Sequence, residues 1–413
     1  FLRPVLFVCG ILTLLMAGLM LAVACFAWWR QDPEMEVFLI SFGITLGCGL
    51  LLVFSCRDRG FHLVSRQLYL LTSLSWVLMS LFGALPLFFS HFELSAEDAV
   101  FEAVSGITTT GSTILSGIEH LAPSLLLWRS LLQWLGGLGG IGMAVSILPF
   151  LRVGGMRLFH TESSDWSEKS IPRVQSLARL LVLTYLTLSV CCVLSYWLAG
   201  MSLFDAVNHA MATVSTGGFA TDDRSMGRFS LGILWVSIVF MLLSALPFTL
   251  LIGFFRRPSM DLLRNQQVRG FFAIIAAVSL VLTADLIDLH VFAPFEAFTQ
   301  ATFNLVSVIT TTGFASADYT QWGSFSIALF FVVTFIGGCS GSTSGGMKVF
   351  RFQLSYLFLR SQIRKLIHPS GVFVTQYNGR PVQDDIILSA VAFSFLFFVT
   401  LAVVTLLLAL MGL

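Results

Sequence analysis

Threonine and glycine are clustered at three places in this sequence, and we call these places the Thr/Gly segments. Carbonyl and hydroxyl oxygens can replace the hydration shell of a monovalent cation without the cost of buried charged side chains. Glycine also reaches the backbone conformations that turn carbonyls toward an ion. The clusters therefore indicate an ion-binding path. They read Ile107-Thr108-Thr109-Thr110-Gly111, Val214-Ser215-Thr216-Gly217-Gly218 and Ile309-Thr310-Thr311-Thr312-Gly313.

The last glycines of the segments, which we call the key glycines, are spaced at 107 residues (111 to 218) and 95 residues (218 to 313). One such cluster is more often an ordinary external loop, but three in register favour a repeated site. Short helices are expected before each segment, over 96–106, 204–214 and 295–308, with their negative dipole ends toward the site. Asp98 and Asp205 lie near the start of two of these helices, where we interpret them as caps rather than ion ligands.

A fourth glycine-rich stretch, Gly337–Met347, which we call the glycine loop, interrupts an apolar segment. So many glycines cannot continue a stable helix, and flexible backbone inside a pore is typical of a gate. A packing joint without movement is the alternative. Lys348 either adds positive charge near the inner pore or extends to the cytoplasmic interface. The candidate gate residues are Gly337, Gly338, Ser340, Gly341, Ser342, Gly345, Gly346 and Lys348.

Two other motifs allow different chemistry. Gly338-Cys339-Ser340-Gly341 has the form used by intramembrane serine proteases, which also need a histidine base on a later membrane helix. The only later histidine is His368, in a basic loop, so an enzyme is not favoured. The glycines of Gly136–Gly140 indicate a close helix contact rather than a second gate.

Composition places these motifs in a membrane. Hydrophobic residues make up 56% of the 413 residues and charged residues only 11%, and the formal net charge of +1 does not indicate a nucleic-acid partner. We predict an all-α polytopic membrane protein with nine membrane segments. They are Val5–Trp29, Val37–Ser55, Leu68–Phe89, Leu125–Phe150, Leu180–Ala199, Leu231–Phe255, Phe271–Leu289, the broken segment Ser326–Phe358, and Ile386–Leu410.

Basic residues predict the orientation, because 19 of the 23 Lys and Arg fall in loops on one side, which is therefore cytoplasmic. The repeated unit is a helix, a pore loop and a helix. The predicted division is a two-helix extension (1–60), three pore repeats (61–160, 161–262 and 263–365) and the first helix of a fourth (366–413). One more period would place a fourth Thr/Gly segment just beyond Leu413.

At these residues the chain resembles the Trk/Ktr superfamily of potassium-uptake proteins, and most closely its TrkH branch. The resemblance rests on SGITTTGST, STGGFAT, ITTTGFAS, GGCSGSTSGGMKVFR, QWLGGLGGIG (Gln133–Gly142) and VGGM (Val153–Met156). It implies four pore repeats around one pore in the bacterial inner membrane, with Gly337–Met347 as the gating loop. The implied potassium filter residues are Thr109, Thr110, Gly111, Thr216, Gly217, Gly218, Thr311, Thr312 and Gly313.

The resemblance also implies partners. It predicts a homodimer and a cytoplasmic TrkA-type regulatory subunit that binds the nucleotide, while this chain binds no cofactor and carries K⁺ as its substrate. From the residues alone, a coupled cation symporter with a broken-helix site stays an alternative to a gated channel. A non-conducting membrane scaffold is a third possibility, although no bulky side chain plugs the Thr/Gly segments.

Overall fold

The computed structural model describes residues 2–57, 64–151, 171–256, 260–371 and 373–412, and its long elements are all helices. The motif Val153–Met156 and the basic residues Arg59, Arg152, Arg157, Lys169 and Arg257 lie outside the described residues. The main helices outside the three short ones before the Thr/Gly segments are α1 (Arg3–Arg30), α2 (Met35–Ser55), α3 (Ser65–Phe88), α5 (Pro123–Leu151), α7 (Ile171–Leu198), α9 (Leu231–Ser244), α12 (Gln266–Asp288), α15 (Val349–Ile367) and α16 (Asp384–Leu410).

Among the described residues, six helices are long and apolar enough to cross a membrane: α1, α2, α3, α7, α12 and α16. A bent pair of helices makes a seventh if it is counted as one span. Helix α5 and the broken segment, now α14 (Ser324–Val333) followed by the glycine loop and α15, lie where the other crossings were predicted. The predicted helical membrane fold is thus confirmed, apart from two short strand pairs.

One predicted span was wrong in its geometry. The segment Leu231–Phe255 is two helices, α9 and α10 (Phe248–Arg256), which meet at an angle of 103°. Pro247 explains the position of the break, because proline has no N–H to donate and its ring clashes with the preceding turn. Hydropathy is continuous across the break, so composition alone does not reveal it.

The three expected short helices are present as α4 (Ala96–Ile107), α8 (Leu203–Val214) and α13 (Pro294–Ile309). With 12, 12 and 16 residues, they are about 18–24 Å long, too short for a 30 Å hydrocarbon core. Each ends four residues before its key glycine, so the Thr/Gly segments follow directly from the helix C-termini.

Two of these helices are capped by serine. The hydroxyls of Ser95 and Ser202 accept hydrogen bonds from the backbone N–H groups of Asp98 (3.1 Å) and Asp205 (3.0 Å). Both aspartates lie in the first turn, where a carboxylate complements the helix dipole. Their predicted place near the helix starts is confirmed, but the caps are the serines three residues earlier and not the aspartates.

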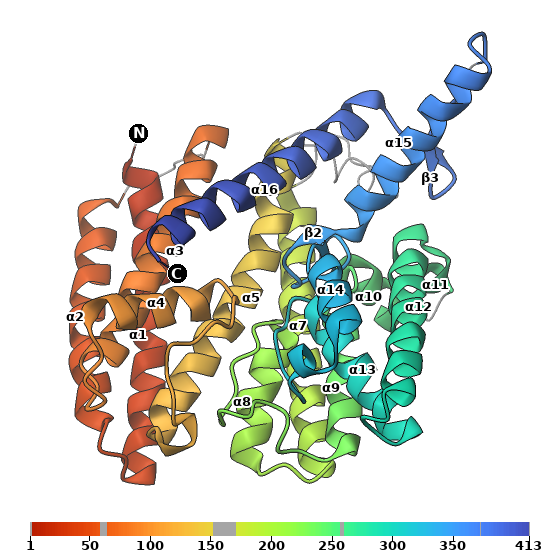
Figure 1. The fold of residues 1–413 in the computed structure, drawn as a ribbon. Coiled ribbons are helices and arrows are strands. Elements are labelled where there is room, and N and C mark those ends of the chain that lie inside the picture. Colours follow the sequence, from red (N-terminus) through yellow and green to blue (C-terminus); the bar gives the residue numbers. More distant parts are fainter. Residues whose placement is uncertain (1, 58–63, 152–170, 257–259, 372, 413) are drawn as a thin grey trace.

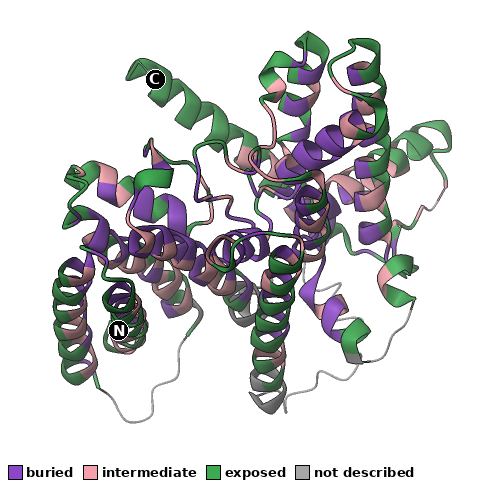
Figure 2. Cartoon of the chain, turned by 90° about the horizontal axis from the view of Figure 1, so that it is seen from below, coloured by how far each residue is buried: buried purple, intermediate pink, exposed green. Residues whose placement is uncertain are grey.

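The helices lie in groups from one side of the molecule to the other. Figure 1 shows α1, α2 and α3 at one side of the molecule and α12 and α13 at the other, with α5, α7, α8 and α9 between them. Buried residues gather toward the middle and the outer helices expose their far faces (Figure 2). Exposed apolar side chains such as Leu51, Phe54 and Leu280 suit contact with lipid.

The structure also contains two small strand pairs that the sequence did not predict. Strand β1 (Ile336–Gly337) pairs in parallel with β2 (Met347–Lys348), which closes the glycine loop at its base. Strands β3 (Gln376–Tyr377) and β4 (Arg380–Pro381) form a hairpin over Asn378 and Gly379, both at positive φ. The Asn-Gly pair is a strong hairpin signal that sequence reasoning missed.

Candidate ion pathway

The three Thr/Gly segments share an unusual backbone. The key glycines have φ values of 80°, 81° and 84° at Gly111, Gly218 and Gly313. The threonines two positions earlier also have positive φ, at 55° (Thr109), 54° (Thr216) and 55° (Thr311). A β-branched residue rarely adopts this conformation, and such strain concentrates at functional sites.

Hydrogen bonds from each segment to its own short helix hold this backbone in place. The N–H of each strained threonine donates to a carbonyl three residues earlier, and the next N–H donates to a carbonyl five residues earlier. The second of these bonds joins Thr110 to Ser105 (2.9 Å), Gly217 to Ala212 (2.8 Å) and Thr312 to Ser307 (2.9 Å). The three segments are thus copies of one structure, in the register that the sequence predicted.

The segments also lie side by side. A Cβ atom added at Gly111 would overlap the carbonyl oxygen of Gly217, and one added at Gly218 would overlap the carbonyl oxygen of Thr312. The second segment therefore lies between the first and the third. A Cβ added at Gly313 meets no atom of the described residues within 4 Å. The key glycines thus allow a backbone approach that any other residue would prevent at two of the three positions.

Helix α5 supports the first two segments from behind. A Cβ at Gly136 would overlap the carbonyl of Ile107, and one at Gly137 would lie 2.8 Å from the Cα of Ser215. These contacts confirm the predicted close packing for Gly136 and Gly137, whose partners are the ends of α4 and α8, but not for Gly139 and Gly140. One turn earlier, the Gln133 amide makes two hydrogen bonds to the second segment.

A buried ion pair lies on the same face of α5. Arg129 and Glu102 are 1% and 0% exposed, and their closest nitrogen and oxygen are 2.7 Å apart. The carboxylate of Glu102 also accepts hydrogen bonds from the hydroxyl of Thr113 and the N–H of Ile114. The guanidinium reaches the second segment's extension, with its Cζ 4.1 Å from the ring centre of Phe219. Sequence reasoning missed both this pair and Gln133.

Glu102 occupies a position that is polar and buried in each short helix, nine residues before the key glycine. Its counterparts are His209 and Asn304. The Asn304 Nδ2 donates to the hydroxyl of Ser316 at 2.9 Å, and its Oδ1 accepts from the N–H of Ser316 at 3.2 Å. In the second repeat, the chain beyond the segment is instead held by Asp205, which pairs with Arg228 at 2.7 Å. Each segment is therefore anchored on both sides of its key glycine.

The glycine loop touches the third Thr/Gly segment. The N–H of Gly345 donates to the Thr311 hydroxyl at 2.6 Å, and the hydroxyls of Ser344 and Thr311 are 3.4 Å apart. A Cβ at Gly345 or Gly346 would lie 3.2–3.3 Å from Thr311 side-chain atoms. The loop thus joins the threonine whose backbone is strained.

The same loop fills the break between α9 and α10. The N–H groups of Cys339 and Thr343 donate to the carbonyls of Ala245 (2.9 Å) and Ser244 (3.2 Å), and the N–H of Phe248 donates to the carbonyl of Gly341 (2.9 Å). Irregular backbone at membrane depth requires such partners. The two broken segments therefore satisfy each other's backbone groups.

Comparison with known proteins gives the family. A family model described as a cation transport protein, TrkH, matches residues 34–412. The chain belongs to the TrkH family. It is 48% identical to the Trk system potassium uptake protein TrkI of Halomonas elongata, over 99% of this chain and 84% of that protein. It is 36% identical to the Trk system potassium uptake protein TrkH of Vibrio parahaemolyticus, over 93% of this chain and 81% of the relative.

A solved TrkH-family structure has the same fold. The crystal structure of the potassium transporter TrkH from Vibrio parahaemolyticus matches with a TM-score of 0.92 at 34% identity, over 100% of this chain and 86% of that one. Together with the apolar helices, this membership makes the chain an integral multi-pass protein of the bacterial inner membrane.

Lys348 of this TrkH-family chain contacts the glycine loop. Its ammonium folds back into the glycine loop, where it donates to the carbonyl of Ser344 and lies 3.5 Å from the hydroxyl of Ser342. The side chain is half-buried rather than extended to the interface. Lys348, which directly follows the loop, therefore bonds to the middle and second half of the loop.

The protease motif finds no support in the TrkH-family fold. His368 is exposed at the end of α15, and no hydrogen bond joins Ser340 to a histidine within the described ranges. Transport proteins, not enzymes, are the relatives found.

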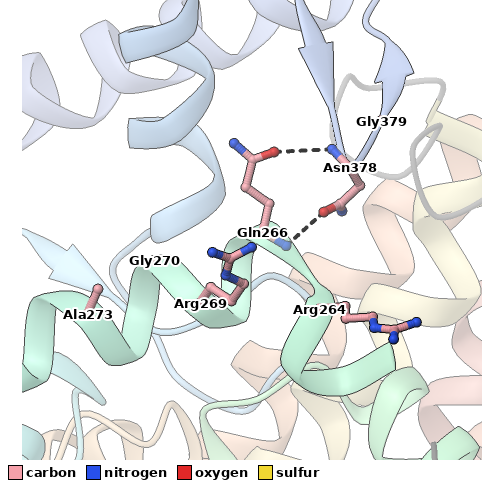
Figure 3. Close-up of a pocket in the computed structure, with 7 residues that line it drawn as sticks. All are labelled: Arg264, Gln266, Arg269, Gly270, Ala273, Asn378 and Gly379. Atoms are coloured by element: carbon pink, nitrogen blue, oxygen red, sulfur yellow. Dashed lines mark hydrogen bonds between the residues drawn. The ribbon is translucent and has the colours of Figure 1, made fainter. Parts of the chain in front are cut away.

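A cavity of about 640 Å³ lies between α11 (Asp261–Arg264), the start of α12 and the β3–β4 hairpin. Arg264 and Arg269 line it, and both are exposed. Figure 3 shows the hairpin fixed to α12 by two hydrogen bonds, from Gln266 N to Asn378 Oδ1 (2.7 Å) and from Asn378 N to Gln266 Oε1 (3.2 Å). The cavity belongs to the side that the basic residues predict to be cytoplasmic.

Proposed function

We propose that this chain carries K⁺ into the cell through a gated, channel-like pore. One observation carries the proposal: three Thr/Gly segments repeat the same strained backbone and lie against one another at the ends of three short helices. Oxygens on such segments suit a dehydrated monovalent cation. The potassium uptake named for the relatives supplies the identity of the ion.

The proposed filter residues are the nine that the resemblance implied. They are Thr109, Thr110 and Gly111, then Thr216, Gly217 and Gly218, then Thr311, Thr312 and Gly313. The proposed gate is the glycine loop with Lys348. Its contact with Thr311 supports this role, because a loop joined to one segment can obstruct the path beside it. The chain itself is proposed to bind no cofactor and to catalyse no reaction.

A coupled symporter is the second candidate, since α9–α10 and the α14–α15 segment are both broken, as helices around transporter sites often are. The repeats favour a channel because they share one orientation, whereas coupled transporters often have inverted repeats. The α9–α10 break and the glycine loop also bond to each other. Flux that needs a second ion or a proton gradient would favour the symporter.

Removing part of the glycine loop tests its role. We expect deletion of Gly341 to Gly345 to raise K⁺ flux, because it removes the bonds to Thr311, Ser244 and Phe248 that hold the loop in place. The measurement is K⁺ uptake by liposomes containing the full-length protein, with the melting temperature in detergent as a control for folding. Unchanged or abolished flux in a folded variant would contradict the gate assignment.

Lys348→Met tests the hydrogen bonds from the Lys348 ammonium to Ser342 and Ser344 of the glycine loop. A hydrogen bond to a charged group contributes about 1.5–3 kcal/mol, so we expect K⁺ flux to rise by about tenfold when this link is lost. Lys348→Arg keeps the charge and the donors and should stay near the wild-type flux. If the Met variant conducts like wild type, Lys348 does not restrain the loop.

We also infer the expected partners from the family. A second copy of the chain would form the dimer. A TrkA-like nucleotide-binding subunit would dock on the basic side, where Arg264 and Arg269 line the cavity and Arg360, Arg364 and Lys365 are exposed on α15. Mass measurement of the detergent-solubilised protein, with and without that subunit, tests both partners. A monomer that never binds it would contradict them.

A further inference from the structure

The second Thr/Gly segment is held differently from the other two. In the first and third segments, the threonine before the key glycine bonds to another threonine of its own segment. The hydroxyl oxygens are 2.8 Å apart for Thr108 and Thr110 and 2.7 Å apart for Thr310 and Thr312. The second segment has Gly217 at this position and has no side chain there to make the bond.

Gln133 of α5 takes the place of the missing side chain. Its Nε2 donates to the Gly217 carbonyl at 2.6 Å, and its Oε1 accepts from the N–H of Phe219 at 3.0 Å. The Gln133 side chain is fully buried. A Cβ added at Gly217 would overlap this amide, so Gln133 and a side chain at position 217 exclude each other.

These two bonds fix the peptide planes on both sides of Gly218. In a trans peptide the carbonyl and the N–H point in opposite directions. Because the N–H of Phe219 points to Gln133, the carbonyl of Gly218 points away from it. The amide thereby sets the direction of the key carbonyl in the second segment.

We propose that Gln133 is the positioning residue of the second filter segment and so determines ion selectivity from outside the pore. This inference rests on the proposed function, because it assumes that the segments form a filter. Gln133 acts through the backbone of residues 217–219 and contacts no ion itself. In the other two segments a hydrogen-bonded pair of threonines does this work within the segment, and in the second segment Gln133 does it from α5.

The test measures K⁺ and Na⁺ flux into liposomes that contain the full-length protein. We expect Gln133→Ala to lower the K⁺/Na⁺ flux ratio by about tenfold, since both hydrogen bonds are lost. Gly217→Thr alone should also lower the ratio, because its side chain collides with Gln133. The double variant Gln133→Ala with Gly217→Thr should recover most of the ratio, since Ser215 and the new hydroxyl can form the pair found in the other segments.

Ser130→Ala is the matched control, because Ser130 is buried on the same helix and, among the described residues, its hydroxyl bonds only the Leu126 carbonyl (3.2 Å). Its ratio should not change. Gln133→Glu keeps the size of the side chain and the acceptor for the Phe219 N–H but loses the donor to the Gly217 carbonyl. If the Ala variant does not fold, the flux ratio of the Glu variant tests the inference in its place. A wild-type ratio in either folded Gln133 variant, or a double variant no better than Gln133→Ala, overturns the inference. Wild-type protein without selective K⁺ flux overturns the proposed function and the inference together.

Discussion

Gly218→Ala is expected to abolish most of the selectivity of the pore. Alanine at φ 81° costs about 1–2 kcal/mol in the left-handed region, and its Cβ would also overlap the carbonyl oxygen of Thr312. Since about 1.4 kcal/mol corresponds to a tenfold change, the K⁺/Na⁺ flux ratio should fall by at least about tenfold. Flux of both ions into liposomes measures the ratio.

Gly140→Ala is the control for this variant. Gly140 lies within α5, and an added Cβ meets no atom within 4 Å in the part of the chain that the structure describes. Its flux ratio should match wild type. Gly111→Ala should behave like Gly218→Ala, because it meets the Gly217 carbonyl in the same way. A Gly218→Ala protein that folds and keeps its selectivity would show that the key glycines do not shape a filter.

Arg129→Leu is expected to have the largest effect on stability. It leaves the Glu102 carboxylate buried without its partner, and breaking a buried pair in this way typically costs about 3–5 kcal/mol. The first two Thr/Gly segments lose a shared support, because this pair reaches Thr113 on one side and Phe219 on the other. Thermal unfolding of the purified protein in detergent measures the loss.

Two further variants show whether the loss of stability comes from the unpaired buried carboxylate or from substituting an arginine as such. Replacing both members, as Arg129→Met with Glu102→Leu, removes the uncompensated charge and should recover much of the melting temperature. Arg224→Ala breaks an ion pair with Asp222 in which the arginine is 72% exposed, so it should change the melting temperature little. Equal losses for Arg129→Leu and Arg224→Ala would contradict the structural importance of the buried pair.

Much of this fold could be predicted because the repeats are strong signals in the chain itself. The Thr/Gly segments, the helices before them and most spans depend on local composition, and the structure has them in the predicted register. The break at Pro247 was missed because the apolar run continues across it, and its bonding partners lie in the glycine loop about 100 residues later. The predicted repeat boundaries remain predictions.

The side chains that hold the Thr/Gly segments in place could not be predicted, because the residues they contact are distant in sequence. Gln133 and Gly217 are 84 residues apart, and each is unremarkable until α5 is seen to pass behind the second segment. Glu102 and Arg129 would each be costly inside a membrane alone, and only their contact explains their presence. A glycine in place of threonine at position 217 was the one local sign that the second segment differs.

Ion flux through the purified full-length protein is the most direct measurement of the central claim. Liposomes loaded with K⁺ and diluted into medium with an impermeant cation in place of Na⁺, and with no proton gradient, would report uptake of tracer Rb⁺ or K⁺. A selective filter made by the Thr/Gly segments predicts uptake driven by the K⁺ gradient alone, with K⁺ and Rb⁺ favoured over Na⁺. Absence of K⁺-dependent flux in correctly folded protein, or flux that requires a second ion, would contradict a passive, gated K⁺ pore.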